Sequence, residues 1–168
     1  MRYFIDFEFD EDGRTIEPIS LGIARDLPNE QGGYYMEFAF DVDKVARTNP
    51  WVWGNVLPLL TWEPAQRFSK EQARDEILRI IGNDPEPEFW GYYCDYDWVV
   101  FCQLFGRMVE LPDHFPRICM DVHQMAKMLR APKMLRPPKS AREHNALVDA
   151  LWIRDFYRVL AAYERSDQ

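Results

Sequence analysis

The chain has 168 residues, of which 47% are hydrophobic, and its formal net charge is −8. This length supports a single domain with a sizeable core, which we expect to span residues 1–168, and no stretch approaches the roughly 20 apolar residues that cross a bilayer. The negative charge argues against the passive electrostatic binding of polyphosphate chains that strongly basic proteins show. Because acidic residues begin at position 6, the start does not resemble a signal peptide, and we expect a cytoplasmic protein.

The N-terminal third predicts three strands joined by short turns. Residues 2–9 alternate as a strand with one apolar face does, and further strands are expected over residues 16–24 and 34–40. Three consecutive strands of this kind indicate an antiparallel meander. Residues 41–62 contain two prolines and three tryptophans, and we expect one or two short helices interrupted by proline there.

The clearest helix follows Ser69. Ser69 and Gln72 have the spacing of a capping box, and Gly82 stands where a C-terminal glycine is favoured. Between them an apolar stripe recurs with helical spacing, formed by Ala73, Ile77, Ile80 and Ile81.

Strands and helices then alternate along the chain. The sequence predicts strands over residues 89–93 and 118–122, helices over 97–105, 123–129 and 141–163, and a proline-rich loop over 131–139. Strands first, followed by strands alternating with helices, indicate an α/β fold in which helices cover a mixed sheet.

Positive charge gathers in one segment. No acidic residue lies between Val122 and Arg142, whereas this stretch holds Lys127, Arg130, Lys133, Arg136, Lys139 and Arg142. We expect a phosphate-contact loop here, and a solvated flexible connection is the alternative.

The three cysteines, Cys94, Cys102 and Cys119, stand in apolar surroundings. They have neither the density of a disulfide scaffold nor the paired spacing of a zinc site. We therefore expect reduced core residues.

Two carboxylates leave the same face of the first strand. Asp6 and Glu8 are two residues apart, which places their backbone origins about 6.6–6.8 Å from each other. The flanking residues are apolar, where an unpaired carboxylate is costly, so the pair favours a shared cation. The alternative is an edge strand whose wet face carries acids.

Two more segments carry candidate ligands. Asp97 falls at a predicted strand-to-helix junction, where an ordinary helix N-cap is the alternative role and Asp95 competes for that of ligand. His144 stands five residues before Asp149, and Asp149 lies within an otherwise apolar helical stretch. Oxygen ligands of this kind select Mg²⁺ or Mn²⁺ rather than zinc.

The order Asp-x-Glu, then Asp, then His-x-Ala-x-x-Asp resembles the DEDDh 3′–5′ exonucleases, which have a ribonuclease H-like fold. The start Met1–Phe4, the segment from Trp51 to Leu60 and the run His144–Ala150 resemble, within that superfamily, the ribonuclease T-like exoribonuclease AS group, which prefers polyadenylate. The resemblance spans nearly the whole chain. It implies a mixed five-stranded sheet whose first three strands are antiparallel.

The resemblance also implies a two-metal mechanism. Asp6, Glu8 and Asp149 would hold one ion that lowers the pKa of a bound water. A second ion, bridged by Asp6, would steady the leaving 3′ oxygen, and Asp97 would complete the site. His144 would take the proton of the water, a task that suits an imidazole at neutral pH.

This chain departs from the family pattern at two points. Phe7 replaces a threonine common between the first two acids, and residues 92–95 lack the asparagine that often precedes the third. Neither change removes a metal ligand, so substrate preference is affected more than catalysis. Alternative functions are a 3′–5′ exonuclease acting on DNA, and a non-catalytic nucleic-acid-binding module.

Aromatic side chains are the expected base platforms, because single-strand binding relies on stacking. We expect Phe9, Tyr96 and, less directly, Trp53 to contact the 3′ end of single-stranded RNA, including adenylate-rich ends, or of DNA. The resemblance implies a homodimer, for which the aromatic segment near Trp51 offers an interface. His114 and His123 lack an acidic partner at the spacing of His144 and are assigned no role.

Overall fold

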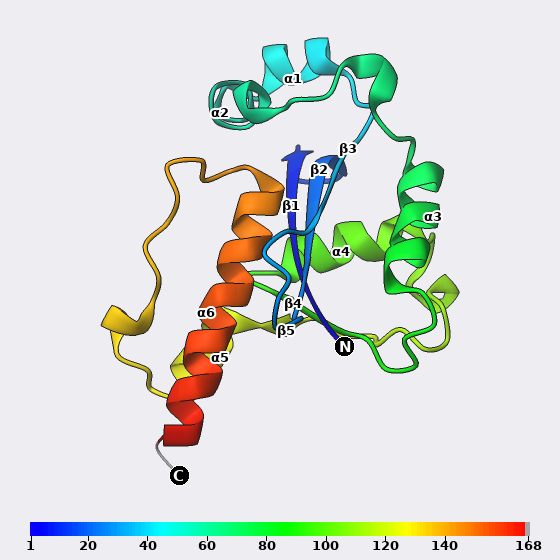
Figure 1. Ribbon diagram of the computed structural model, residues 1–168. Helices are drawn as coiled ribbons and strands as arrows, with labels where there is room; N and C mark the ends of the chain where they lie inside the picture. The colour runs from blue at the N-terminus through cyan, green and yellow to red at the C-terminus, as the bar shows by residue number, and fades with distance from the viewer. Residues whose placement is uncertain (167–168) are drawn as a thin grey trace.

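The computed structural model describes residues 1–166, in which helices cover both faces of a mixed five-stranded sheet (Figure 1). The strands are β1 (Arg2–Glu11), β2 (Ile16–Arg25), β3 (Tyr34–Glu37), β4 (Glu88–Gly91) and β5 (Met120–Asp121). Their order across the sheet is β3-β2-β1-β4-β5. The first three strands pair antiparallel, and β4 and β5 run parallel to β1. This topology confirms the predicted α/β fold and is consistent with a ribonuclease H-like sheet.

The helices form two layers and a cap. They are α1 (Val42–Thr48), α2 (Pro50–Asn55), α3 (Lys70–Ile81), α4 (Asp95–Leu104), α5 (Val122–Met128) and α6 (Ala146–Ser166). Helix α6 packs on β1 and β2 with α5 beside it, α3 and α4 lie on the other face, and α1 and α2 lie beyond one end of β1 and β2 (Figure 1). Within residues 1–166, no helix has the length and apolar character that a membrane crossing requires.

Strand β1 is buried on both faces, so the expectation of a single apolar face was wrong. Ile5 and Phe7 belong to the core cluster that includes α3 and α4, whereas Phe4 belongs to the cluster with α6. The strand lies between β2 and β4, which also excludes the edge-strand interpretation of its acids. Asp6 and Glu8 therefore project from the centre of the sheet toward the α6 layer.

The prediction for α3 is confirmed in detail. Ser69 and Gln72 form the reciprocal capping box, and Gly82 ends the helix with φ +59°. The buried residues of α3 are the four predicted ones, Ala73, Ile77, Ile80 and Ile81. In the preceding segment the structure has two short helices, as predicted, and Pro50 stands at the junction between them as the first residue of α2, where Asn49 caps the helix by accepting from the Val52 N–H.

Several element boundaries differ from prediction. Strand β3 ends at Glu37, β4 ends at Gly91, and α4 begins at Asp95, two residues early. The largest difference is α6, which begins at Ala146 and not at residue 141. His144 has φ +73°, a left-handed conformation that no helix contains, so the chain turns at His144 and Asn145 before the helix starts.

Helix α6 approaches the sheet more closely than side chains would allow. A Cβ atom on Gly22 of β2 would lie 2.1 Å from the carbonyl oxygen of Ala146. Only glycine fits there, and the first turn of α6 rests directly on the backbone of β2. This contact sets the height of Asp149 above the sheet.

The three cysteines are free in the structure. Cys94 and Cys102 are buried, as predicted, and Cys119 is partly buried. The thiols of Cys94 and Cys119 both lie 3.6 Å from the carbonyl oxygen of Met120.

Candidate active site

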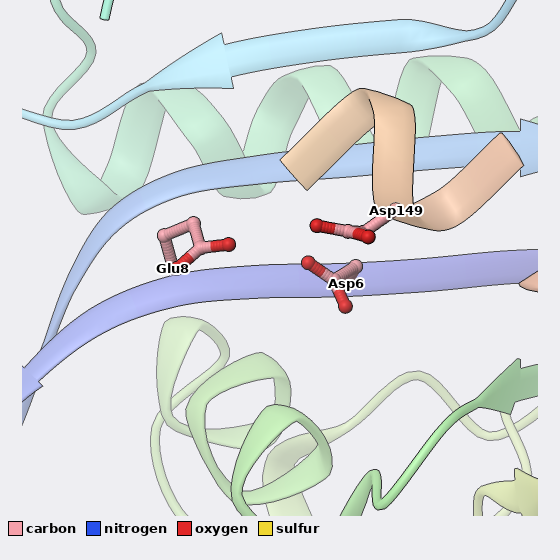
Figure 2. A group of neighbouring side chains, drawn as sticks. All are labelled: Asp6, Glu8 and Asp149. Carbon is pink, nitrogen blue, oxygen red and sulfur yellow. The ribbon is translucent and has the colours of Figure 1, made fainter. Parts of the chain in front are cut away.

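Three carboxylates meet between β1 and α6. Asp6 and Glu8 on β1 and Asp149 on α6 each offer an oxygen, and these oxygens lie within 4.8 Å of one another (Figure 2). Glu8 is 9% exposed and Asp149 is 4% exposed. Asp6 is partly buried. Three acids this close and this poorly solvated repel one another, so the arrangement favours a bound cation.

Asp97 approaches β1 along the edge of the strand that pairs with β4. Strand β4 pairs with β1 only from Arg2 to Phe4, which leaves the next N–H groups of β1 without a neighbouring strand on that edge. Oδ1 of Asp97 accepts from the Phe7 N–H at 2.7 Å. The residue lies in the first turn of α4, whose N-cap is Cys94, so the N-cap interpretation of Asp97 was wrong.

The turn before α6 is built around Asp149. Oδ2 of Asp149 accepts from the His144 N–H at 2.7 Å, and the Asn145 side chain accepts from the Val148 N–H at 3.2 Å. The imidazole of His144 packs edge-on against Trp51, with ring centroids 4.9 Å apart. The carboxylate thus fixes the loop that presents the histidine.

Lys139 already brings a cation to the acids. Its ammonium lies 2.8 Å from Oδ1 of Asp149 and 4.2 Å from the centroid of the Trp152 ring. The ammonium compensates part of the negative charge of the acids. Asp6, Glu8 and Asp149 could hold a metal ion, and their donors are all carboxylate oxygens, the type that Mg²⁺ and Mn²⁺ prefer.

One cavity of about 430 Å³ is lined by all five residues that the sequence predicts as metal ligands or general base, namely Asp6, Glu8, Asp97, His144 and Asp149. Its lining consists of acids and His144, two basic side chains and several aromatic rings: Asp6, Phe7, Glu8, Phe9, Trp51, Tyr92, Tyr93, Asp97, Arg136, Lys139, Glu143, His144 and Asp149. Asp95 is not among them, which favours Asp97 as the fourth carboxylate.

Burial and mutual repulsion raise the pKa values of Asp6, Glu8 and Asp97. Burial, followed by the charge of Asp149, raises the pKa of Glu8 to about 8, and burial raises the pKa of Asp97 to about 7. The pKa of Asp6 lies well above its usual value, because the side chain is desolvated and faces Asp97 and Glu8. The ammonium of Lys139 lowers the pKa of both Asp6 and Glu8 but does not offset these effects.

These shifts predict that the metal-free protein loses stability as the pH rises. Between the ordinary carboxyl range and about pH 8, Glu8 holds a proton in the folded chain and not in the unfolded one. The folded state therefore binds more protons, and the free energy of unfolding falls as the pH rises through this window. Thermal unfolding in a chelator at pH 6 and pH 8 measures this difference.

Cation binding should show the opposite trend. Ligands must lose their protons to coordinate, so Mn²⁺ affinity should increase by about tenfold or more between pH 6 and pH 8. Calorimetric titration at the two pH values gives the affinities. An Mn²⁺ affinity that stays constant or falls with pH would contradict the assignment of these acids as ligands.

The predicted base platforms are distributed unequally. Phe9 lines the cavity, and Tyr96 extends this surface by stacking on Phe9 with ring centroids 5.8 Å apart. Trp53 lines a separate depression with Leu57 and Pro58, so the structure does not bring it to the carboxylates. Trp51, two residues earlier and 54% exposed, lies in the cavity instead.

Sequence reasoning missed several residues of the cavity wall. Trp51 was considered only for an interface, and Tyr92 and Tyr93 were noted only for the missing asparagine. Lys139 and Arg136 belong to the predicted basic segment, which gave a usable signal for both. No local pattern marks Trp51, because its partner His144 is distant in the sequence.

Comparison with known proteins gives two informative relatives. No protein-family model matches the chain. Proteins from two strains of Mycobacterium tuberculosis, CDC 1551 / Oshkosh and ATCC 25618 / H37Rv, are named 3′–5′ exoribonucleases. Each is 40% identical to this chain over 154 residues, which cover 89% of this chain and 87% of the relative.

Proposed function

Since the chain belongs to the family of these 3′–5′ exoribonucleases, we propose that it is a metal-dependent exoribonuclease that shortens single-stranded RNA from the 3′ end. The observation that carries the chemistry is the meeting of Asp6, Glu8 and Asp149 within 4.8 Å, beside Asp97 and His144 in one cavity. In this proposal the protein is a DEDDh exonuclease, similar to the exoribonuclease AS group that prefers polyadenylate.

The reaction adds water across the terminal phosphodiester. The water oxygen bonds to phosphorus, the bond from phosphorus to the 3′ oxygen breaks, and that oxygen takes up a proton. The products are a nucleoside 5′-monophosphate and an RNA shorter by one nucleotide with a free 3′ hydroxyl.

The four carboxylates are the proposed metal ligands. Asp6, Glu8 and Asp149, with Asp97 beside them, would hold two Mg²⁺ or Mn²⁺ ions. When bound, such ions promote the ionisation of water and offset the negative charge of the reacting phosphate. This charge compensation also answers how a chain of net charge −8 can bind a polyanion.

His144 is the proposed general base. The 2.7 Å hydrogen bond from its backbone N–H to Asp149 fixes the main chain at His144, and the residue lines the same cavity as the carboxylates. Packing against Trp51 restricts the ring further. From this position the imidazole accepts the proton of the attacking water.

Phe9, extended by Tyr96, is the proposed platform for the terminal base, including adenine, and Trp51 replaces Trp53 as the third aromatic residue near the reaction. The homodimer implied by the resemblance stays a prediction.

Digestion of matched oligonucleotides tests the proposal. RNA and DNA dodecamers of adenylate and of mixed sequence, labelled at the 5′ end, are incubated with Mg²⁺, with Mn²⁺ and with a chelator. We expect a ladder that shortens from the 3′ end, faster on RNA, and no products in the chelator. Equal rates on DNA would overturn the sugar preference, and the absence of hydrolysis with Mn²⁺ would indicate a binding module.

A further inference from the structure

A second cavity, of about 570 Å³, adjoins the carboxylate cavity and shares Tyr92 and Arg136 with it. Its lining is formed by the residue after β4, by α5, by the loop after α5 and by α6: Tyr92, His123, Ala126, Lys127, Arg130, Ala131, Pro132, Lys133, Arg136 and Phe156. We call it the basic cavity. Its size falls in the range of about 300–1,000 Å³ typical of ligand sites.

The charge of the basic cavity contrasts with that of the whole protein. Its lining holds four cationic side chains and no acid, in a chain of net charge −8. Among residues 1–166, none of Lys127, Arg130 and Lys133 takes part in an ion pair. Cations that gather around one cavity without acidic partners are the electrostatic signature of a polyanion site.

Aromatic rings lie where the two cavities meet, and we call Tyr92, Tyr93 and His123 the aromatic floor. The Tyr92 ring contacts His123 edge-on at 5.4 Å, and the Tyr93 hydroxyl lies 3.2 Å from Nε2 of His123. The guanidinium of Arg136 lies over Tyr92, 5.1 Å from its centroid. Rings and guanidinium planes offer stacking surfaces to unpaired bases, and cations beside them can contact phosphates.

The backbone of this region is held in unusual conformations. Tyr93 has φ +58° and Arg130 has φ +50°, and with His144 they are the non-glycine residues of positive φ within residues 1–166. All three line one of the two cavities. Such strain gathers where a structure keeps side chains in set positions for binding.

We propose that the basic cavity binds the RNA strand upstream of the terminal nucleotide, on the 5′ side of the bond that is cut. This inference rests on the proposed function: when the 3′ end occupies the carboxylate cavity, the rest of the strand has to leave it. Tyr92 and Arg136 lead from one cavity into the other, toward the unpaired cations. The phosphates then lie against Lys127, Arg130 and Lys133, and a base stacks on the aromatic floor.

The test replaces two exposed lysines without disturbing the fold. Lys127→Gln with Lys133→Gln removes two positive charges and keeps much of each side chain's length. Binding is measured by fluorescence anisotropy with a 5′-labelled RNA dodecamer and with a dinucleotide competitor. All proteins carry His144→Asn, which slows cleavage during the measurement. The matched control is Arg74→Gln with Arg79→Gln, which removes two exposed charges from α3 on the other face of the sheet.

The double lysine variant should weaken dodecamer binding by at least about threefold and reduce the slope of log affinity against log salt by about 1.4, because each phosphate contact on a single strand contributes about 0.7. Adenylate and mixed sequences should lose affinity equally. The gain in affinity from dinucleotide to dodecamer should shrink, and the arginine control should retain it.

Two failures are distinguishable. If the double lysine variant keeps the dodecamer affinity and the salt slope of the control, the basic cavity is not on the RNA path and the inference is overturned. If the protein with His144 intact does not hydrolyse the dodecamer with Mn²⁺, the proposed function fails instead. The binding measurement then still decides whether the basic cavity holds RNA.

Discussion

Asp6→Asn should lower kcat for RNA hydrolysis by about 10³-fold or more. Cation catalysis supplies several kcal/mol of transition-state stabilisation, and each 1.4 kcal/mol corresponds to about tenfold in rate. Asp6 interacts electrostatically with Asp97, Glu8 and Asp149, so its loss affects the whole donor set. Steady-state hydrolysis of a labelled RNA dodecamer, with saturating Mn²⁺, measures the effect.

The same substitution should stabilise the metal-free protein. Within residues 1–166 the Asp6 carboxylate makes no side-chain hydrogen bond, and its charge is desolvated and faces other acids. A neutral amide of equal size removes this repulsion, so the melting temperature in a chelator at pH 8 should rise, while the stabilisation by Mn²⁺ should largely disappear. Asp113→Asn, at an exposed site, is the matched control. Loss of activity together with a lower melting temperature would instead indicate a structural role for Asp6.

His144→Asn should lower kcat by about 10²- to 10⁴-fold, the usual contribution of a general base. Asparagine is the better substitution than alanine here, because His144 has φ +73° and asparagine tolerates this conformation. The backbone N–H to Asp149 is then retained, and the turn before α6 should keep its shape.

The variant should still bind Mn²⁺ with nearly unchanged affinity, which separates the histidine from the carboxylates. Calorimetry measures the affinity, and the pH dependence of kcat should lose the part that depends on the base. His114→Asn, on an exposed histidine outside the cavity, serves as the control. If His144→Asn turned over at the rate of the control, the general-base assignment would be wrong.

Local signals explain which parts of the fold were predictable. The capping box, apolar stripe and terminal glycine of α3 all act within a few residues, and the structure reproduces each of them. The alternation of β1 likewise placed Asp6 and Glu8 on one face. It did not show that both faces are covered, because Phe4 is buried by α6, which lies at the other end of the sequence.

The features that could not be predicted depend on contacts between distant segments. The sequence predicts that the last helix begins at residue 141, five residues before its actual start. Nothing local reveals that the Asp149 carboxylate holds His144 in a left-handed turn. Trp51 reaches His144 through the packing of α2 over the end of the sheet. The union of basic residues and aromatic rings in the basic cavity also depends on how α5 lies beside α6.

Gly22 lies inside β2, where a glycine weakens a strand unless its missing side chain serves a purpose. A glycine inside a strand often marks a close backbone approach, and here it admits the carbonyl of Ala146. The spacing between Asp149 and the acids of β1 is thus set by main chain resting on main chain. A larger residue at position 22 would push the first turn of α6 off the sheet and carry Asp149 away from Asp6 and Glu8, so the separation of these three carboxylates depends on a hydrogen atom standing where every other residue has a Cβ.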